Sequence, residues 1–153
     1  MVQQFSRCRG SYLLLMVVEQ AQPLKVGRWG TLQLQPGFYY YCGSAFGPGG
    51  VAARVGHHCR LSPRPRWHID YLRYHMALKE VWYSCDPERR EHHWAGVLAR
   101  MQGVEVAAPG LGSSDCSCEA HLFYSRERRS FAGFRRRLLL DDPSHQPLCQ
   151  VII

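Results

Sequence analysis

Five polar side chains of this sequence have the types that phosphodiester hydrolysis needs. Tyr12 lies in the first apolar run and Tyr41 lies at the end of an aromatic run. Arg54 and His58 are four residues apart on an expected helix, so they share one face. Glu91 is a carboxylate on a later helix. Hydrolysis needs a base for the attacking water, a cation for the developing charge and a carboxylate that binds a metal, and this set supplies all three.

A small α+β domain is expected to position these residues. The apolar runs predict strands at 11–18, 38–42, 79–84, 104–107 and 120–125, and a hairpin at 25–35. Helical patterns are expected at 51–59, 67–78, 86–101 and 130–140, the third of them capped by Asp86 before Pro87. The prediction is therefore a small mixed β-sheet flanked by helices, with an inserted β-hairpin.

Composition favours a single basic domain that meets a polyanion. The chain has 153 residues and a formal charge of +7, with a pI near 9.2. No apolar run approaches the roughly 18 residues of a membrane span, and the longest early run is only 13–18. Seven cysteines is an odd number without the spacing of a secreted scaffold, which favours reduced thiols. We therefore expect a soluble, cytoplasmic protein that does not enter a membrane.

Two short motifs resemble the signature of the GIY-YIG nucleases. Gly10-Ser11-Tyr12 is similar to the first half of that signature, and Tyr41-Cys42-Gly43 is similar to the second half. The family has an Arg on the helix after the second half and a His or Tyr one turn later, which matches Arg54 and His58. The neighbouring His57 could take the second role instead, but the spacing favours His58. Its metal-binding Glu follows at a distance that matches Glu91.

Longer stretches resemble the Uri-type branch of these endonucleases. They lie at 37–45, 67–72, 112–118 and 121–124. The resemblance covers residues 10–125 and implies a GIY-YIG-like nuclease domain. Residues 1–9 would form a ragged N-terminal extension, and 126–153 a basic C-terminal helix and tail.

The resemblance implies a metal-dependent endonuclease that hydrolyses DNA. Tyr12 or Tyr41 would act as general base or position the attacking water. Arg54 would stabilise the charged transition state, and His58 would relay a proton or orient a phosphate oxygen. Glu91 would bind one Mg²⁺ (or Mn²⁺) ion, a hard cation that prefers carboxylate and phosphate oxygens.

Further basic residues are candidates for phosphate contacts, which position DNA without reading its sequence. They are Arg60, Arg64, Arg66, His68, Arg135 and Arg136. An ordinary solvated helix face is the alternative for the last two. His68 and Asp70 are two residues apart and point to different faces of one helix, so one of them could line the site, and His68 is the candidate.

Two other functions remain open. The two signature tyrosines are 29 residues apart (41 − 12), and the chain has no Asn, which the family often uses in its site. A nucleic-acid-binding module of the same fold with weak or no catalysis is consistent with both departures. Cys116, Cys118 and His121 suggest a metal-binding interaction domain instead, but this spacing lacks a clear fourth ligand, so packing is the preferred interpretation.

Overall fold

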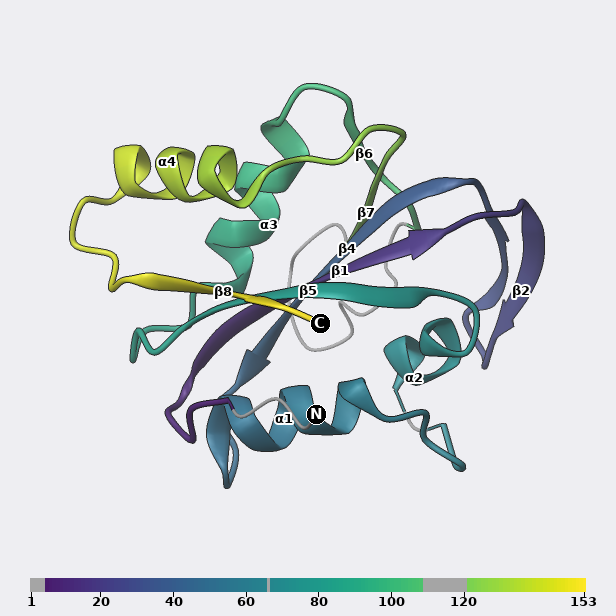
Figure 1. The fold of residues 1–153 in the computed structure, drawn as a ribbon, viewed down its shortest axis with the longest axis horizontal. Helices are drawn as coiled ribbons and strands as arrows, with labels where there is room; N and C mark the ends of the chain where they lie inside the picture. Colours follow the sequence, from purple (N-terminus) through teal and green to yellow (C-terminus); the bar gives the residue numbers. More distant parts are fainter. Residues whose placement is uncertain (1–4, 66, 109–120) are drawn as a thin grey trace.

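A six-stranded sheet forms the centre of the computed structural model, which describes residues 5–65, 67–108 and 121–153 (Figure 1). Its strands are β1 (Gly10–Val18), β4 (Gly37–Ala45), β5 (Ala77–Ser84), β6 (Val104–Val106), β7 (Leu122–Ser125) and β8 (Leu148–Ile152). They lie in the order β6-β7-β4-β1-β5-β8, and every pairing between these described strands is antiparallel. The α+β class is confirmed. The expectation of a mixed sheet is wrong, because neighbouring strands run in opposite directions throughout the described sheet.

The inserted hairpin is present as a separate two-stranded sheet. It consists of β2 (Gln22–Val26) and β3 (Gly30–Leu34), so it begins three residues earlier than expected. Its turn contains Gly27, whose φ of 47° lies in the left-handed region that favours glycine. The hairpin accounts for the long separation between Tyr12 and Tyr41.

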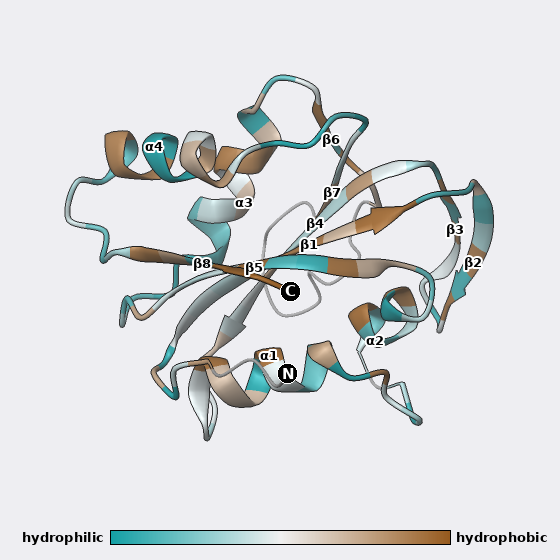
Figure 2. Ribbon diagram, viewed as in Figure 1, coloured by the Kyte–Doolittle hydropathy of each residue, from teal (hydrophilic) through white to brown (hydrophobic). Residues whose placement is uncertain are grey.

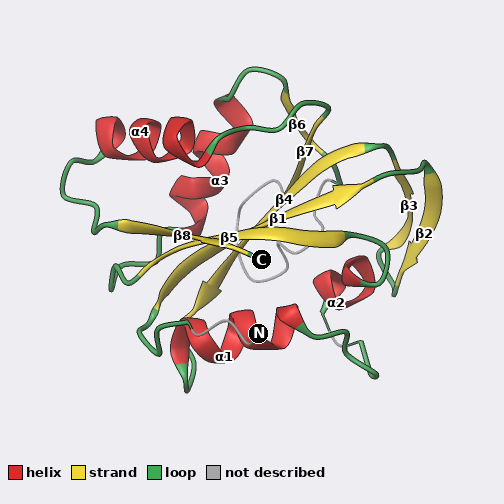
Figure 3. Cartoon of the chain, in the orientation of Figure 1, coloured by secondary structure: helices red, strands yellow, loops and turns green. Residues whose placement is uncertain are grey.

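Helices cover both faces of the sheet (Figure 3). They are α1 (Gly50–Cys59), α2 (His68–Arg73), α3 (Glu91–Arg100) and α4 (Phe131–Asp141). The first two lie on one side of the sheet with the hairpin, and the last two lie on the other side (Figure 1). None of the helices in the described part of the chain is long and apolar enough to span a bilayer.

The central strand β1 is buried on both faces, which explains its unbroken apolar run. Tyr12 and Leu14 belong to the core under α1, whereas Leu13 and Leu15 belong to the core under α3 and α4. Figure 2 shows the arrowhead end of β1 in the brown of hydrophobic residues. Because successive side chains of a strand point to opposite faces, Tyr12 must face α1.

Two expected helices have different boundaries. The helix expected at 67–78 ends at Arg73, since β5 begins at Ala77. The helix expected from Asp86 begins at Glu91 instead. The Asp86 carboxylate accepts hydrogen bonds from the backbone N–H groups of Glu88 and Gln146, at 2.9 and 3.0 Å, and so shapes a turn instead of capping a helix.

The N-terminal segment is fastened to α1, so the ragged terminus expected there is wrong for its described part. The carbonyl groups of Ser6 and Cys8 accept hydrogen bonds from the first turn of α1, each at 2.8 Å. Cys8 also forms a disulfide with Cys85, which corrects the expectation of reduced thiols for this pair. Among the described cysteines, Cys42, Cys59 and Cys149 form no disulfide.

The C-terminal tail completes the sheet, which the sequence did not indicate. Strand β8 pairs with β5, from Glu80 opposite Ile152 to Ser84 opposite Leu148. Residues 126–153 thus pack as part of the same domain, with α4 against α3.

The close approach of the N-terminal segment to α1 gives a first prediction. Gly50 has a φ of 58°, and a Cβ atom there would overlap the carbonyl groups of Arg7 and Cys8. We expect Gly50→Ala to lower the free energy of unfolding by about 2 kcal/mol or more. Gly56 lies on the same helix in open space, with no atom within 4 Å of the position that a Cβ would take, so Gly56→Ala should raise it by about 0.5–1 kcal/mol. Urea denaturation measures both, and equal effects of the two changes would contradict the packing described.

Candidate active site

A buried tyrosine and a buried histidine form the centre of the site. Tyr12 on β1 and His58 on α1 are each 1% exposed, and Oη of Tyr12 lies 2.7 Å from Nε2 of His58. Val51 and Val55 pack α1 on the sheet, which turns His58 towards β1. Gly43 lies opposite Tyr12 in the register, and a Cβ at Gly43 would overlap the Tyr12 ring. The glycine of the second signature half therefore makes room for the tyrosine of the first.

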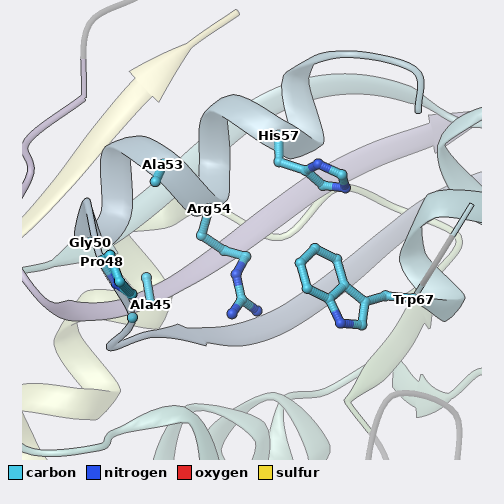
Figure 4. Close-up of a pocket in the computed structure, with 8 residues that line it drawn as sticks. Ala45, Pro48, Gly50, Ala53, Arg54, His57 and Trp67 are labelled. Carbon is cyan, nitrogen blue, oxygen red and sulfur yellow. The ribbon is translucent and has the colours of Figure 1, made fainter. Parts of the chain in front are cut away.

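Tyr41 and Arg54 flank this pair. The ring of Tyr41, on β4, lies 6.3 Å from the ring of His58. The guanidinium group of Arg54 hydrogen-bonds to Tyr12 and stacks over the Trp67 ring, 4.6 Å from its centroid. Figure 4 shows Arg54 on α1 pointing into the same space as His57 and Trp67. The cation is thus held beside the phenol.

Glu91 reaches the same end of the sheet from the first turn of α3. The backbone N–H of Arg90 donates to Oγ of Ser11 at 3.0 Å, which fixes the start of α3 beside the residue before Tyr12. The carbonyl of His121 accepts the backbone N–H of Cys42, next to Tyr41, and Nδ1 of His121 lies 3.9 Å from the Glu91 carboxylate. The Glu91 side chain is 14% exposed.

Both phenols are neutral at neutral pH. Burial raises the pKa of Tyr12 well above its ordinary value; Tyr41 and Glu91 act in the same direction, and Arg54 opposes them. Burial likewise raises the pKa of Tyr41, again against Arg54. Glu91 influences both phenols, so the carboxylate lies within electrostatic reach of the pair.

His58 is held as a neutral imidazole. Burial lowers its pKa to about 3, and the neighbouring His57 and Arg54 act in the same direction. A neutral imidazole has one nitrogen without a proton, and this nitrogen can accept a hydrogen bond from the Tyr12 hydroxyl. The site therefore contains a phenol with an adjacent acceptor and an adjacent guanidinium.

The lowered pKa of His58 predicts a pH-dependent stability. The unfolded chain binds a proton at this residue below its ordinary pKa of 6.5, whereas the folded chain does not bind one until about pH 3. The stabilising contribution is therefore complete above pH 6.5 and is lost as the pH falls towards 3. From pH 7.5 to 5, the free energy of unfolding should fall by about 2 kcal/mol more in the wild type than in His58→Gln. Urea denaturation in EDTA measures this, and identical pH slopes would contradict the assignment.

A second histidine of α1 is paired with a carboxylate that was not among the predicted site residues. Nε2 of His57 lies 2.8 Å from Oδ1 of Asp70, which is 3% exposed. The other oxygen of Asp70 accepts the backbone N–H of Trp67 at 3.0 Å, as a capping residue does. His68 begins α2 and is half-buried, and Asp70 is the residue of α2 that reaches His57. The sequence held one signal for this carboxylate: Asp70 lies three residues after Trp67, at the start of an expected helix, where a carboxylate can bond to the backbone of the capping residue.

The remaining candidates are divided between two faces. Arg60 and Arg64 are exposed in the segment that follows α1, and Arg66 lies outside the described residues. Arg135 and Arg136 are exposed on α4, on the side of the sheet opposite α1, so the fold does not bring them to Arg54 (Figure 1). Cys116 and Cys118 also lie outside the described residues, whereas His121 is buried beside Glu91.

The donor set at Glu91 fits a divalent cation. Among the described residues, the groups that form ion pairs with its carboxylate are His92 and His121, each at 3.9 Å, and no Lys or Arg neutralises it. One carboxylate, with phosphate oxygens and water as further ligands, is a usual environment for Mg²⁺. Glu91 would hold the ion from the protein side.

A cavity of about 210 Å³ opens beside Arg54, and Figure 4 shows it. Its lining combines the glycine-rich loop before α1 with side chains of α1 and with Trp67, namely Ala45, Gly47, Pro48, Gly50, Ala53, Arg54, His57 and Trp67. Arg54 is the fixed positive charge in this lining. The cavity suits a small anionic group.

The fold and site define a small α+β domain with two phenols, a guanidinium, an imidazole and a carboxylate at one end of an antiparallel sheet. The chain belongs to the family described as domain of unknown function DUF123, whose model matches residues 11–139. Among curated proteins and solved structures, the comparisons find no match.

Proposed function

We propose that this protein is a metal-dependent endonuclease that hydrolyses phosphodiester bonds of DNA, of the kind that its GIY-YIG and Uri-type resemblance implies. The observation that carries the proposal is the cluster around Tyr12, whose hydroxyl meets His58 at 2.7 Å and Arg54, with Glu91 within electrostatic reach. Plasmid nicking in Mg²⁺ or Mn²⁺, beside the Glu91→Gln protein, tests it. The expected cytoplasmic location rested on reduced thiols, whereas a disulfide such as Cys8–Cys85 is usual in an oxidising compartment.

In the proposed reaction, the chain activates water and stabilises the phosphate. In the ionised form that Arg54 and the metal would favour, Oη of Tyr12 takes a proton from the attacking water, and the neutral His58 orients this oxygen through its hydrogen bond. Arg54 stabilises the charge that develops on the phosphate oxygens. A Mg²⁺ or Mn²⁺ ion held by Glu91 would polarise the phosphate and stabilise the leaving oxygen. Tyr41 closes the site and helps to orient the water.

The charge of the chain supports DNA as the substrate, since a formal +7 favours a polyanion. The segment with Arg60 and Arg64 adjoins α1, which carries Arg54. We therefore expect the backbone of DNA to contact this side of the molecule, and Arg135 and Arg136 to contribute little to the same complex.

This division of the basic residues gives a prediction for binding. The double variant Arg60→Gln/Arg64→Gln should weaken binding to a short duplex and reduce the slope of log K against log salt by about 2, because each lost phosphate contact removes about 0.9. The matched variant Arg135→Gln/Arg136→Gln removes the same charge from the other face and should leave the slope unchanged. Fluorescence anisotropy at several salt concentrations measures both slopes, and equal losses would contradict this placement of DNA.

A second candidate is a nucleic-acid-binding module of the same fold with weak or no catalysis. It is favoured by the burial of both tyrosines, which raises the pKa of each phenol and makes it a poor base without further activation. Salt-sensitive DNA binding with no nicking in either metal would favour this candidate over the first.

A further inference from the structure

Two consecutive histidines and a buried aspartate converge at the junction of α1 and α2. His57 and His58 lie in the last turn of α1, and Asp70 lies on α2. Each residue offers one ligand atom, and these atoms all lie within 4.8 Å of one another. The group is distinct from Glu91, which comes from α3.

Each of the three side chains presents one possible ligand atom to the group. His58 uses Nε2 for Tyr12, so Nδ1 is its remaining nitrogen, and this atom is buried without a hydrogen-bond partner among the described residues. Asp70 uses Oδ2 for the backbone N–H of Trp67, which leaves Oδ1 beside Nε2 of His57. A buried nitrogen without a partner is costly, and a ligand would remove that cost.

We propose that His57, His58 and Asp70 bind one divalent transition-metal ion of the zinc class. Two imidazoles and one carboxylate are ligands that suit Zn²⁺ and its neighbours better than Mg²⁺. Three protein ligands leave one position open to water or an anionic ligand. That position has room, because His57 lines the cavity of about 210 Å³ that also contains Arg54. The inference goes beyond the proposed function, whose Mg²⁺ ion is held by Glu91.

The surroundings of the cluster are already fixed. The Nε–H group of Arg73 donates to the carbonyl of His58 at 2.7 Å, which joins the end of α1 to α2. The capping bond from Trp67 holds the carboxylate of Asp70 in one orientation. Such outer hydrogen bonds orient ligands and raise metal affinity.

Metal at Nδ1 of His58 determines the proton on its other nitrogen. Nδ1 must carry a lone pair to bind the ion, so Nε2 carries the proton and donates it to Oη of Tyr12. Any proton that Nδ1 holds in the metal-free protein is released or moves to Nε2. Loading the site therefore makes the phenol oxygen an acceptor from both His58 and Arg54.

Titration of the metal-free, full-length protein with Co²⁺ tests the site, with Zn²⁺ as competitor. We expect one equivalent with the visible absorption of a low-coordinate nitrogen and oxygen site, displaced by one equivalent of Zn²⁺. His57→Gln and Asp70→Asn should each weaken binding at least about 10-fold. Asparagine keeps an oxygen for the Trp67 N–H, and His57 is 31% exposed, so both variants are expected to fold. Thermal unfolding without metal checks this.

Two controls separate this site from the others. His75→Gln removes an exposed histidine, which bonds to Gln22, and should not change Co²⁺ affinity. Glu91→Gln should also leave it unchanged, while it removes Mg²⁺-dependent nicking. The proposal would be overturned if the protein did not bind Co²⁺ stoichiometrically, or if Co²⁺ affinity were unchanged in His57→Gln and Asp70→Asn. It would also be overturned if Glu91→Gln lost as much Co²⁺ affinity as these two variants, or if intense thiolate charge-transfer bands showed cysteine ligands. A protein that binds Co²⁺ in this way but does not nick DNA would refute the proposed function alone.

Discussion

Glu91→Gln is expected to lower the Mg²⁺-dependent nicking rate of supercoiled plasmid by at least about 100-fold, with little change in DNA affinity. Glutamine keeps the size and one oxygen of the side chain but loses the charge that attracts the cation. The Glu91 carboxylate is 14% exposed, and its described ion-pair partners are histidines at 3.9 Å, so the change should not break a strong ion pair. Single-turnover nicking and fluorescence anisotropy in Ca²⁺ measure rate and affinity separately.

Glu88 provides the matched control for this experiment. Its side chain is 73% exposed, three residues before Glu91, and it lies 3.4 Å from Arg90. Glu88→Gln removes the same charge from the same segment and should retain the nicking rate within about 2-fold, because exposed ion pairs contribute little. The metal assignment would fail if Glu91→Gln nicked as fast as this control.

Arg54→Ala is the second change with a large expected effect. Removing a cation that is aimed at the developing phosphate charge should lower the single-turnover rate by about 100- to 1000-fold. The guanidinium also hydrogen-bonds to Tyr12, and its charge opposes the rise in the pKa of that phenol. Without Arg54, the phenol therefore loses both a hydrogen-bond partner and the nearby positive charge that favours its ionised form.

A variant that keeps the charge separates these contributions. Arg54→Lys retains a cation but loses the planar group that lies 4.6 Å over Trp67, so its rate should fall between those of the wild type and Arg54→Ala. Arg60→Ala removes an exposed arginine from the end of the same helix and should weaken DNA binding while the rate at saturating protein persists. If Arg54→Ala changed affinity alone and not the saturated rate, Arg54 would be a DNA-binding residue and not a catalytic one.

Local patterns predicted the part of the fold that carries the central pair. The apolar run of β1 and the valines of α1 fix which faces Tyr12 and His58 present, and the structure brings the two within 2.7 Å. Arg54, one turn before His58, follows from helical periodicity. The pairing of β1 with β4, which places Gly43 opposite Tyr12, was not predicted, because periodicity does not specify strand partners.

Long-range interactions decided what the sequence did not reveal. Asp86 before Pro87 has the local form of a helix start, but its carboxylate bonds to the backbone of Gln146, sixty residues away, and α3 begins later. The sequence of strand β8 has no clear alternation of apolar and polar residues, and the strand forms because its backbone pairs with the edge strand β5. The pairing of His57 with Asp70 depends on how α2 packs on α1, which no spacing in either helix encodes.

The carbonyl groups of the N-terminal segment that accept hydrogen bonds from the first turn of α1 have a consequence for phosphate binding. The amides of Val51 and Ala52 already donate to Cys8 and Ser6, and those of Gly50 and Ala53 donate within the adjoining turn. A helix start usually offers such amides to anions, but here the polypeptide itself has saturated them. Nucleic acid at this helix must therefore be bound by cationic side chains, so its residence there should shorten as ionic strength rises.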